Sequence, residues 1–216
     1  MQIVSLNIGL PRDVVWHGRT VTTGIFKEPV AGRVALRRLN LDGDRQADLS
    51  VHGGPFKAVY CYPVEHYAPW TEELGGGALP MGAFGENLTT EGLDEDDVHI
   101  GDEFSIGTAR VVVTQPRMPC YKLGIRFQDD GMVKRFLASR RTGFYLAVVR
   151  EGDLGAGDAI ARAAEDPQRL RVADITRLYV ARAFDRDDAA TAKKALDVAA
   201  LPESWKEYLR DRLADV

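Results

Sequence analysis

The chain has 216 residues, of which 45% are hydrophobic and 28% charged, a composition typical of globular proteins rather than of disordered or membrane-embedded ones. Its formal net charge of −4 argues against a general nucleic-acid binder, because neutralising phosphates requires a basic surface. We find no apolar run long enough to cross a membrane and no basic-then-apolar leader at Met1. We therefore expect a cytoplasmic protein that binds neither nucleic acid nor membrane.

The first two thirds of the chain consist mainly of short segments rich in β-branched and aromatic residues, separated by Gly, Pro, Asp or Asn. This pattern predicts strands over residues 2–9, 21–27, 32–41, 57–62, 98–107, 109–115 and 143–149. Helices are predicted before the glycines at 75–77, where a left-handed cap costs least, and over residues 131–141. Many short strands with few helices indicate a mainly β fold, as a sandwich or barrel.

The spacing of apolar residues becomes helical after Pro167, in the segments 175–184, 187–200 and 202–213. Asp187 or Asp188 could cap the second of these helices, and Pro202 suits the first turn of the third. We therefore predict a β domain over residues 1–168 and a three-helix domain over residues 172–216. The simplest interpretation of the helical domain is a packing or partner module without chemistry.

Cys120 is one of two cysteines in the chain, and its surroundings distinguish it from Cys61. It follows "QPRMP", in which Pro116 and Pro119 stiffen the loop, and residues 115–141 carry seven basic against two acidic side chains. Nearby cations favour a thiolate, the form that binds metal or attacks as a nucleophile. Cys120 is therefore a candidate ligand, whereas Cys61 lies in the alternating "AVYCYP" and is predicted to belong to the core.

A second candidate site lies in the segment 43–60, around the sequence "HGGPFK". His52 precedes Gly53 and Gly54, which let the backbone approach a ligand closely, and Lys57 follows at the start of the next strand. Free amides in such a turn can form an anion-binding nest, so the combination with Lys57 suits a phosphate. A structural histidine remains the alternative for His52. Asp44 and Asp48 could be paired carboxylates for acid–base work, and turn-capping explains them equally well.

A third candidate is "FGENLTTEGL", where Glu86 and Asn87 offer an acceptor and a mixed donor–acceptor pair to a polar heterocycle. The chain contains no Walker loop, GxGxxG, HExxH, CxxC or GxSxG motif, and it does not group Cys and His at zinc spacing. Whatever binds at Cys120 is thus expected to bring most of its own ligands.

Together, "LNLDGDRQADLSVHGGPFKAVYCYPVEHYAPW", "FGENLTTEGL", "VHIGDEFSIGTARVVVTQPRMPCYKL" and the tail "LPESWKEYLRDRL" resemble the MOSC domain family (molybdenum cofactor sulfurase C-terminal domain). Within it the chain is most similar to the YiiM type, the 6-N-hydroxylaminopurine resistance proteins. This resemblance spans nearly the whole chain. It implies a β-barrel-like MOSC domain followed by a three-helix domain, and a bound pyranopterin molybdenum cofactor.

The resemblance also implies roles for individual residues. Cys120 ligates molybdenum, and the dithiolene of the pterin supplies two further sulfurs, so the protein offers only one soft ligand. Arg117, Lys57 and Lys27 hold the cofactor phosphate, which requires Lys57 and Arg117 to converge on one pocket. Asn87 and Glu86 contact the pterin edge, Gly53 and Gly54 approach the cofactor, and His52 orients it or relays a proton.

Such relatives reduce N-hydroxylated small molecules to amines, with electrons from a separate flavoprotein reductase. Two alternatives remain open from the residues. The chain could carry the cofactor and hand it on without turnover, because no general acid stands out. It could also be a metal-free thiol redox enzyme, although no resolving cysteine lies close to Cys120 in the sequence.

Overall fold

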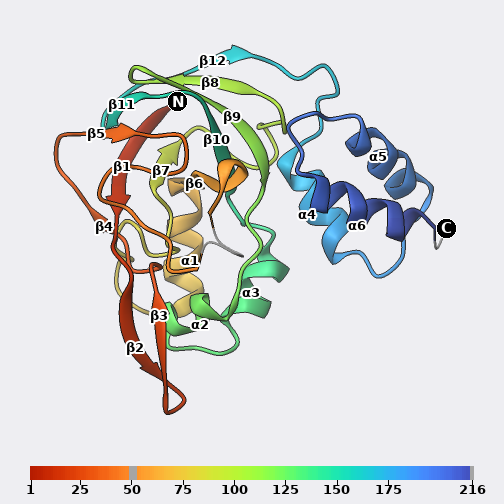
Figure 1. The fold of residues 1–216 in the computed structure, drawn as a ribbon. Coiled ribbons are helices and arrows are strands. Elements are labelled where there is room, and N and C mark those ends of the chain that lie inside the picture. The colour runs from red at the N-terminus through yellow and green to blue at the C-terminus, as the bar shows by residue number, and fades with distance from the viewer. Residues whose placement is uncertain (49–52, 215–216) are drawn as a thin grey trace.

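The computed structural model describes residues 1–48 and 53–214 of the chain (Figure 1). Its strands are β1 (Gln2–Ile8), β2 (Arg12–Trp16), β3 (Arg19–Thr23), β4 (Glu28–Pro29), β5 (Arg33–Leu36), β6 (Val59–Pro63), β7 (Leu88–Glu91), β8 (Glu103–Ile106), β9 (Ala109–Pro116), β10 (Phe144–Arg150), β11 (Gly152–Gly155) and β12 (Ile160–Ala164). Its helices are α1 (Tyr67–Leu74), α2 (Tyr121–Phe127), α3 (Met132–Ser139), α4 (Val172–Val180), α5 (Arg186–Leu196) and α6 (Glu203–Ala214). Two short 3₁₀ helices, η1 (Pro55–Lys57) and η2 (Val64–His66), flank β6.

The principal sheet has eight strands in the order β12-β8-β9-β10-β6-β7-β1-β4. Only β6 and β7 pair in parallel, and η2 and α1 form the crossover that a parallel pair requires. The sheet curls until the start of β1 meets the start of β12, where Gln2 bridges Ala159 and the Ile3 amide donates to the Asp158 carbonyl at 3.0 Å. The predicted mainly β, barrel-like fold is confirmed, with the qualification that the sheet does not close into a continuous barrel.

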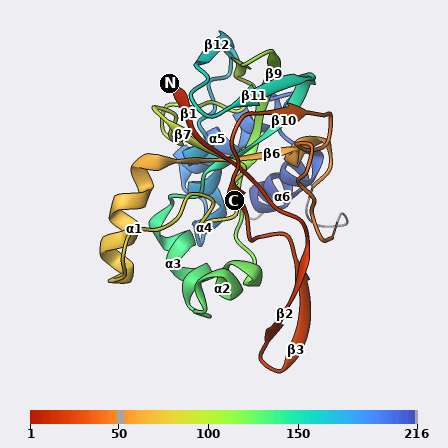
Figure 2. The same ribbon diagram turned by 90° about the vertical axis from the view of Figure 1, so that its left-hand side faces the viewer.

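The hairpin β2–β3 extends away from this sheet as a separate two-stranded ribbon (Figure 2). The strand predicted over residues 21–27 is correct only at its start, since β3 ends at Thr23. The next residue, Gly24, lies so close to the loop at 45–47 that a Cβ there would be 2.5 Å from the Arg45 carbonyl oxygen. Without a side chain at this position the chain passes directly over the loop at 45–47, and the two loops form one wall of the cavity described below.

The core has two parts. The larger runs from the inner face of the sheet, where Val111 and Val113 of β9 are fully buried, into the apolar faces of α4, α5 and α6. The smaller is aromatic and lies under α1 and α3, with Tyr62, Trp70 and Phe84 at its centre. Burying each such side chain contributes roughly 1.5–3 kcal/mol. The predicted core position of Cys61 is confirmed, since it is 2% exposed.

The three C-terminal helices lie together beside β9, away from the β2–β3 hairpin (Figure 1). The predicted helical tail is confirmed. The N-cap of α5 is Asp185, which accepts from the Asp188 amide at 2.8 Å, and the predicted Asp188 completes the capping box by accepting from the Asp185 amide at 3.4 Å. Because the large core runs without interruption from the sheet into these helices, the division into residues 1–168 and 172–216 stays a prediction.

Glu86 holds the turn that leads into β7. It is fully buried, and its Oε1 accepts hydrogen bonds from Tyr67 Oη, from Thr89 Oγ1 at 2.8 Å and from the Gly82 amide at 2.9 Å. Its Oε2 accepts from the Phe84 amide at 3.1 Å. Burial raises the pKa of Glu86, and these hydrogen bonds oppose that effect. The predicted contact of Glu86 with a pterin edge stays a prediction, and it would require these internal hydrogen bonds to be exchanged.

We expect Glu86→Gln to lower the free energy of unfolding by about 1–3 kcal/mol, because the amide group would direct N–H donors at the Phe84 amide. Urea denaturation measures this. The matched control is Glu91→Gln at an exposed position that accepts one hydrogen bond, from Gln2 Nε2 at 2.7 Å, where a change within about 0.5 kcal/mol is expected. Equal midpoints for the two variants would show that the Glu86 carboxylate does not hold this turn.

Candidate functional site

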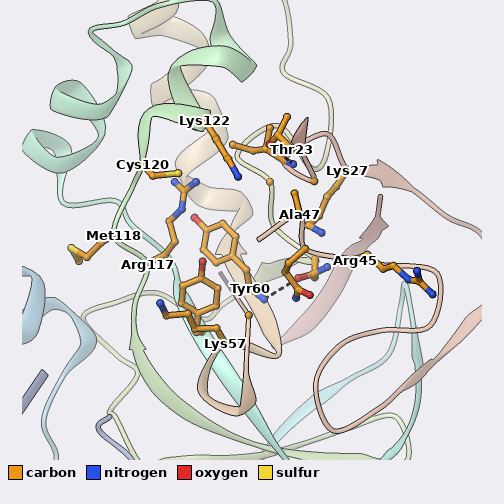
Figure 3. Close-up of a pocket in the computed structure, with 17 residues that line it drawn as sticks. Thr23, Lys27, Arg45, Ala47, Lys57, Tyr60, Arg117, Met118, Cys120 and Lys122 are labelled. Atoms are coloured by element: carbon orange, nitrogen blue, oxygen red, sulfur yellow. Dashed lines mark hydrogen bonds between the residues drawn. The ribbon is translucent and has the colours of Figure 1, made fainter. Parts of the chain in front are cut away.

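A cavity of about 100 Å³ lies between the loop after β3 and the segment that joins β9 to α2. Figure 3 shows its side chains converging from segments that are far apart in the sequence. The walls come from seven parts of the chain: residues 23–27, residues 45–47, the η1 region, Tyr60 of β6, the turn at 85–87, residues 117–122 and Tyr145 of β10. One cavity is lined by Lys57 and, from a segment about sixty residues later in the chain, by Arg117 and Cys120.

Cys120 lines this cavity at the start of α2. Its backbone is extended, with φ −120° and ψ 173°, and its carbonyl accepts from the Leu123 amide at 2.9 Å, which begins the helix. β9 ends at Pro116, and the intervening residues belong to neither strand nor helix. Cys120 is half-buried, so its sulfur is available to a ligand in the cavity, in contrast to Cys61. Burial raises the pKa of the Cys61 thiol well above its ordinary value.

Arg117 places a buried cation beside this sulfur (Figure 3). Its side chain is 6% exposed, and its guanidinium carbon lies 5.2 Å from the centre of the Tyr60 ring and 5.1 Å from that of Phe136. Burial acts to lower the pKa of Arg117, but the neighbouring Tyr60, Tyr145 and Cys120 raise it, so the guanidinium stays charged. Among the described residues, its buried Nη1 atom has no hydrogen-bond partner. A buried donor of this kind suits an anion.

Two lysines add positive charge to the cavity. Lys57 ends η1, which starts after Gly53 and Gly54 with φ angles of 98° and 83°, a region that favours glycine. Burial lowers the pKa of Lys57 below the ordinary 10.5. Lys122, on the first turn of α2, points into the cavity, whereas Arg45 lines its edge with the guanidinium directed away from Cys120 (Figure 3). Gly53 lines the cavity, while Gly54 only begins the helix.

Lys27 and Asn87 reach the cavity wall, but their polar ends are engaged within the protein. Lys27 Nζ forms a buried ion pair with Asp44, and burial lowers the pKa of Lys27 although Asp44 opposes this. Asn87 Nδ2 donates to Asp44 Oδ2 at 2.9 Å, and its Oδ1 accepts from the Tyr60 amide at 3.1 Å. Both residues therefore hold the wall together, and the predicted phosphate contact of Lys27 and pterin contact of Asn87 would require these bonds to be exchanged.

The remaining predicted site residue, His52, lies outside the described residues, as do its neighbours from Leu49 on. Three further residues line the cavity that were not predicted as site residues from the sequence: Tyr60, Tyr145 and Lys122. The sequence does contain a signal for Lys122 as a site residue: it stands two residues after Cys120, and a helix that begins after Cys120 places it on the first turn. Within residues 1–48 and 53–214, no group of three or more His, Cys, Asp or Glu side chains could hold a metal ion. In the same part of the chain, no helix is long and apolar enough to cross a membrane.

Comparison with known proteins shows similarity along almost the entire chain. The 217-residue alignment with YflK of Bacillus subtilis has 40% identity and covers 99% of this chain and 96% of that protein. YiiM of Escherichia coli is 35% identical over 88% of this chain and 84% of its own length. A protein of Gibberella moniliformis named "Reductase" is 32% identical over 76% of this chain, which corresponds to 30% of that longer protein.

The fold gives the same result. The crystal structure of YiiM from Geobacillus stearothermophilus superposes with a TM-score of 0.81 at 37% identity and covers 98% of both chains. That of YiiM from Escherichia coli superposes with a TM-score of 0.77. The family model of the MOSC domain matches residues 48–161, and that of the YiiM-like 3-alpha helix domain matches residues 172–215. The chain therefore belongs to the MOSC domain family and carries the YiiM-like three-helix domain at its C-terminal end.

Proposed function

We propose that the chain binds a pyranopterin molybdenum cofactor in the cavity at Cys120 and reduces N-hydroxylated compounds to amines. The observation that carries this proposal is the position of the Cys120 thiol and the buried Arg117 guanidinium on one cavity, in a chain of the MOSC family. The relative named "Reductase" supports the type of reaction. In the net reaction, R-NHOH takes up two electrons and two protons, the N–O bond breaks, and R-NH2 and water form.

The residues of the cavity fit such a cofactor. A thiolate is the soft ligand that molybdenum with a dithiolene would take from the protein, and Cys120 is the cysteine that lines the cavity. The buried, unpartnered Nη1 of Arg117 suits a phosphate oxygen, since a guanidinium can donate two parallel hydrogen bonds to such a group. Lys57 and Lys122 add point charges to the same anion. The cofactor when bound supplies the two-electron redox chemistry.

The protein's contribution is then to hold, orient and shield. Arg117 is fixed between the Tyr60 and Phe136 rings, which keeps its charge beside the cysteine sulfur without a carboxylate partner among the described residues. Lys27, Asp44 and Asn87 brace the opposite wall through their buried hydrogen bonds. A rigid wall restricts water near the reacting atoms and limits the geometry in which a substrate can approach.

We assign the electrons to a separate flavoprotein reductase and the reaction to the cytoplasm. Cys61 and Cys120 form no disulfide in the structure, which suits a reducing compartment. A single reduction assay on protein loaded with molybdenum tests the proposal: with a chemical reductant, 6-N-hydroxylaminopurine should be converted to the amine. Protein that binds and releases the cofactor without converting the substrate would instead be a carrier.

We expect Cys120→Ala to lose its molybdenum and its turnover, because it lacks the protein's soft ligand. Elemental analysis of protein made in a host that synthesises the pterin, followed by the reduction assay, measures both effects. Cys61→Ala is the matched control: it should keep molybdenum and turnover and only lose stability, since it leaves a small space in the core. Full molybdenum-dependent turnover in Cys120→Ala would contradict the assignment of the ligand.

Phosphate binding should weaken in alkaline solution because of Lys57. Burial lowers the pKa of this amine, so its charge is lost as the pH rises through a value below the ordinary 10.5. Only the charged amine attracts the anion. We expect the affinity for inorganic phosphate to fall in that range, and the fall to move to higher pH in Lys57→Arg, whose guanidinium stays protonated. Identical pH profiles for the two proteins would exclude Lys57 from the anion site.

A further inference from the structure

Trp205 of α6 makes a buried side-chain hydrogen bond to the strand that leads into the cavity. Its Nε1 donates to Gln115 Oε1 at 2.8 Å, and the ring is 8% exposed. The indole also packs edge-on against Tyr179, with ring centres 5.7 Å apart, and against Tyr208, at 5.9 Å. Gln115 stands two residues before Arg117 in β9. The three-helix unit therefore contacts the strand close to the anion-binding guanidinium.

This hydrogen bond determines the orientation of the Gln115 amide. An indole N–H can only donate, so the oxygen end of the amide must face α6. The nitrogen end then faces the other way, toward the Phe56 carbonyl, to which Nε2 donates at 3.4 Å. The same carbonyl accepts a shorter hydrogen bond from Thr114 Oγ1, at 2.7 Å. Two consecutive side chains of β9 thus hold one carbonyl of η1.

η1 depends on these hydrogen bonds from β9, because few interactions within the helix itself stabilise it. It is three residues long, follows glycines with positive φ angles, and has no side-chain cap at Gly54. Phe56 is its middle residue, and Lys57 comes next in the chain. A shift of the Phe56 carbonyl would therefore move Lys57 relative to Arg117 in the cavity that both residues line.

We propose that Trp205 is a positioning residue for the anion site: through Gln115 and the Phe56 carbonyl, it sets the position of Lys57 relative to Arg117. The inference rests on the proposed function in that the anion is taken to be the cofactor phosphate. It gives the three C-terminal helices a role at the cavity, although none of the residues described between 172 and 214 lines that cavity.

The test measures the affinity of the full-length protein for inorganic phosphate by calorimetry or phosphorus NMR. Trp205→Phe keeps an aromatic ring but removes the N–H, and should weaken phosphate binding by about two- to tenfold, the range for one hydrogen bond. The same substitution made on Lys57→Gln should have no further effect, because the residue that Trp205 positions is then missing. A general loss of stability would not depend on Lys57.

Tyr208→Phe is the matched control in the same helix. It removes a hydroxyl that donates to the Tyr179 carbonyl at 3.4 Å and accepts from Arg212 at 2.8 Å, and it should leave phosphate affinity unchanged. If Trp205→Phe does not fold, Gln115→Met breaks the same chain of hydrogen bonds from the strand side and must show the same dependence on Lys57.

The outcomes separate the two proposals. If Lys57→Gln weakens phosphate binding but Trp205→Phe does not, or if Trp205→Phe acts equally in both backgrounds, the positioning role is overturned and the anion site stands. If Lys57→Gln leaves phosphate affinity unchanged, the anion site of the proposed function is itself wrong at Lys57, and the role of Trp205 falls with it.

Discussion

The candidate site depends on one buried cation. Arg117 is almost inaccessible to solvent, and aromatic rings rather than a carboxylate lie against its guanidinium. A cation over an aromatic face gains roughly 0.5–2 kcal/mol, which is less than the several kcal/mol that removing an ion from water costs. The rest of the fold must therefore tolerate this charge, and a bound anion would relieve it. The uncompensated charge of Arg117 therefore favours a negatively charged ligand close to the Cys120 sulfur.

Lys27, a second buried cation on the same cavity, has a carboxylate partner. Its charge is compensated by Asp44, and Asp44 also accepts from the Gly9 amide at 2.9 Å and from Asn87. This network is satisfied internally, so it stiffens the wall without attracting a ligand. The two cations on one cavity thus differ in how their charge is compensated rather than in how deeply they are buried. Of the two, Arg117 is the one with a buried donor that has no partner among the described residues.

Strand patterning and helical spacing were enough to predict the mainly β fold and the helical tail, because local periodicity reflects which face is buried. Cys120, Lys57 and Arg117 could be selected because each stands in an unusual local context. The internal partners of Glu86 and Asn87 could not be predicted, since only the folded chain brings Tyr67 and Asp44 to them. The short helix α2 was missed because seven residues with Gly124 in the middle have weak helix propensity.

The two cysteines show why residue type alone does not identify a metal ligand. Cys61 pairs with Phe144 and Leu88 in the middle of the sheet, where burial raises its pKa and no ligand can approach. Cys120 lies at the point where β9 stops pairing and α2 begins, so its side chain projects into the cavity. The same strand end turns Arg117 toward the sulfur, and Gln115 just before it is held by Trp205. The end of one strand thus brings the cysteine of the cavity, the buried cation and the contact with α6 close together.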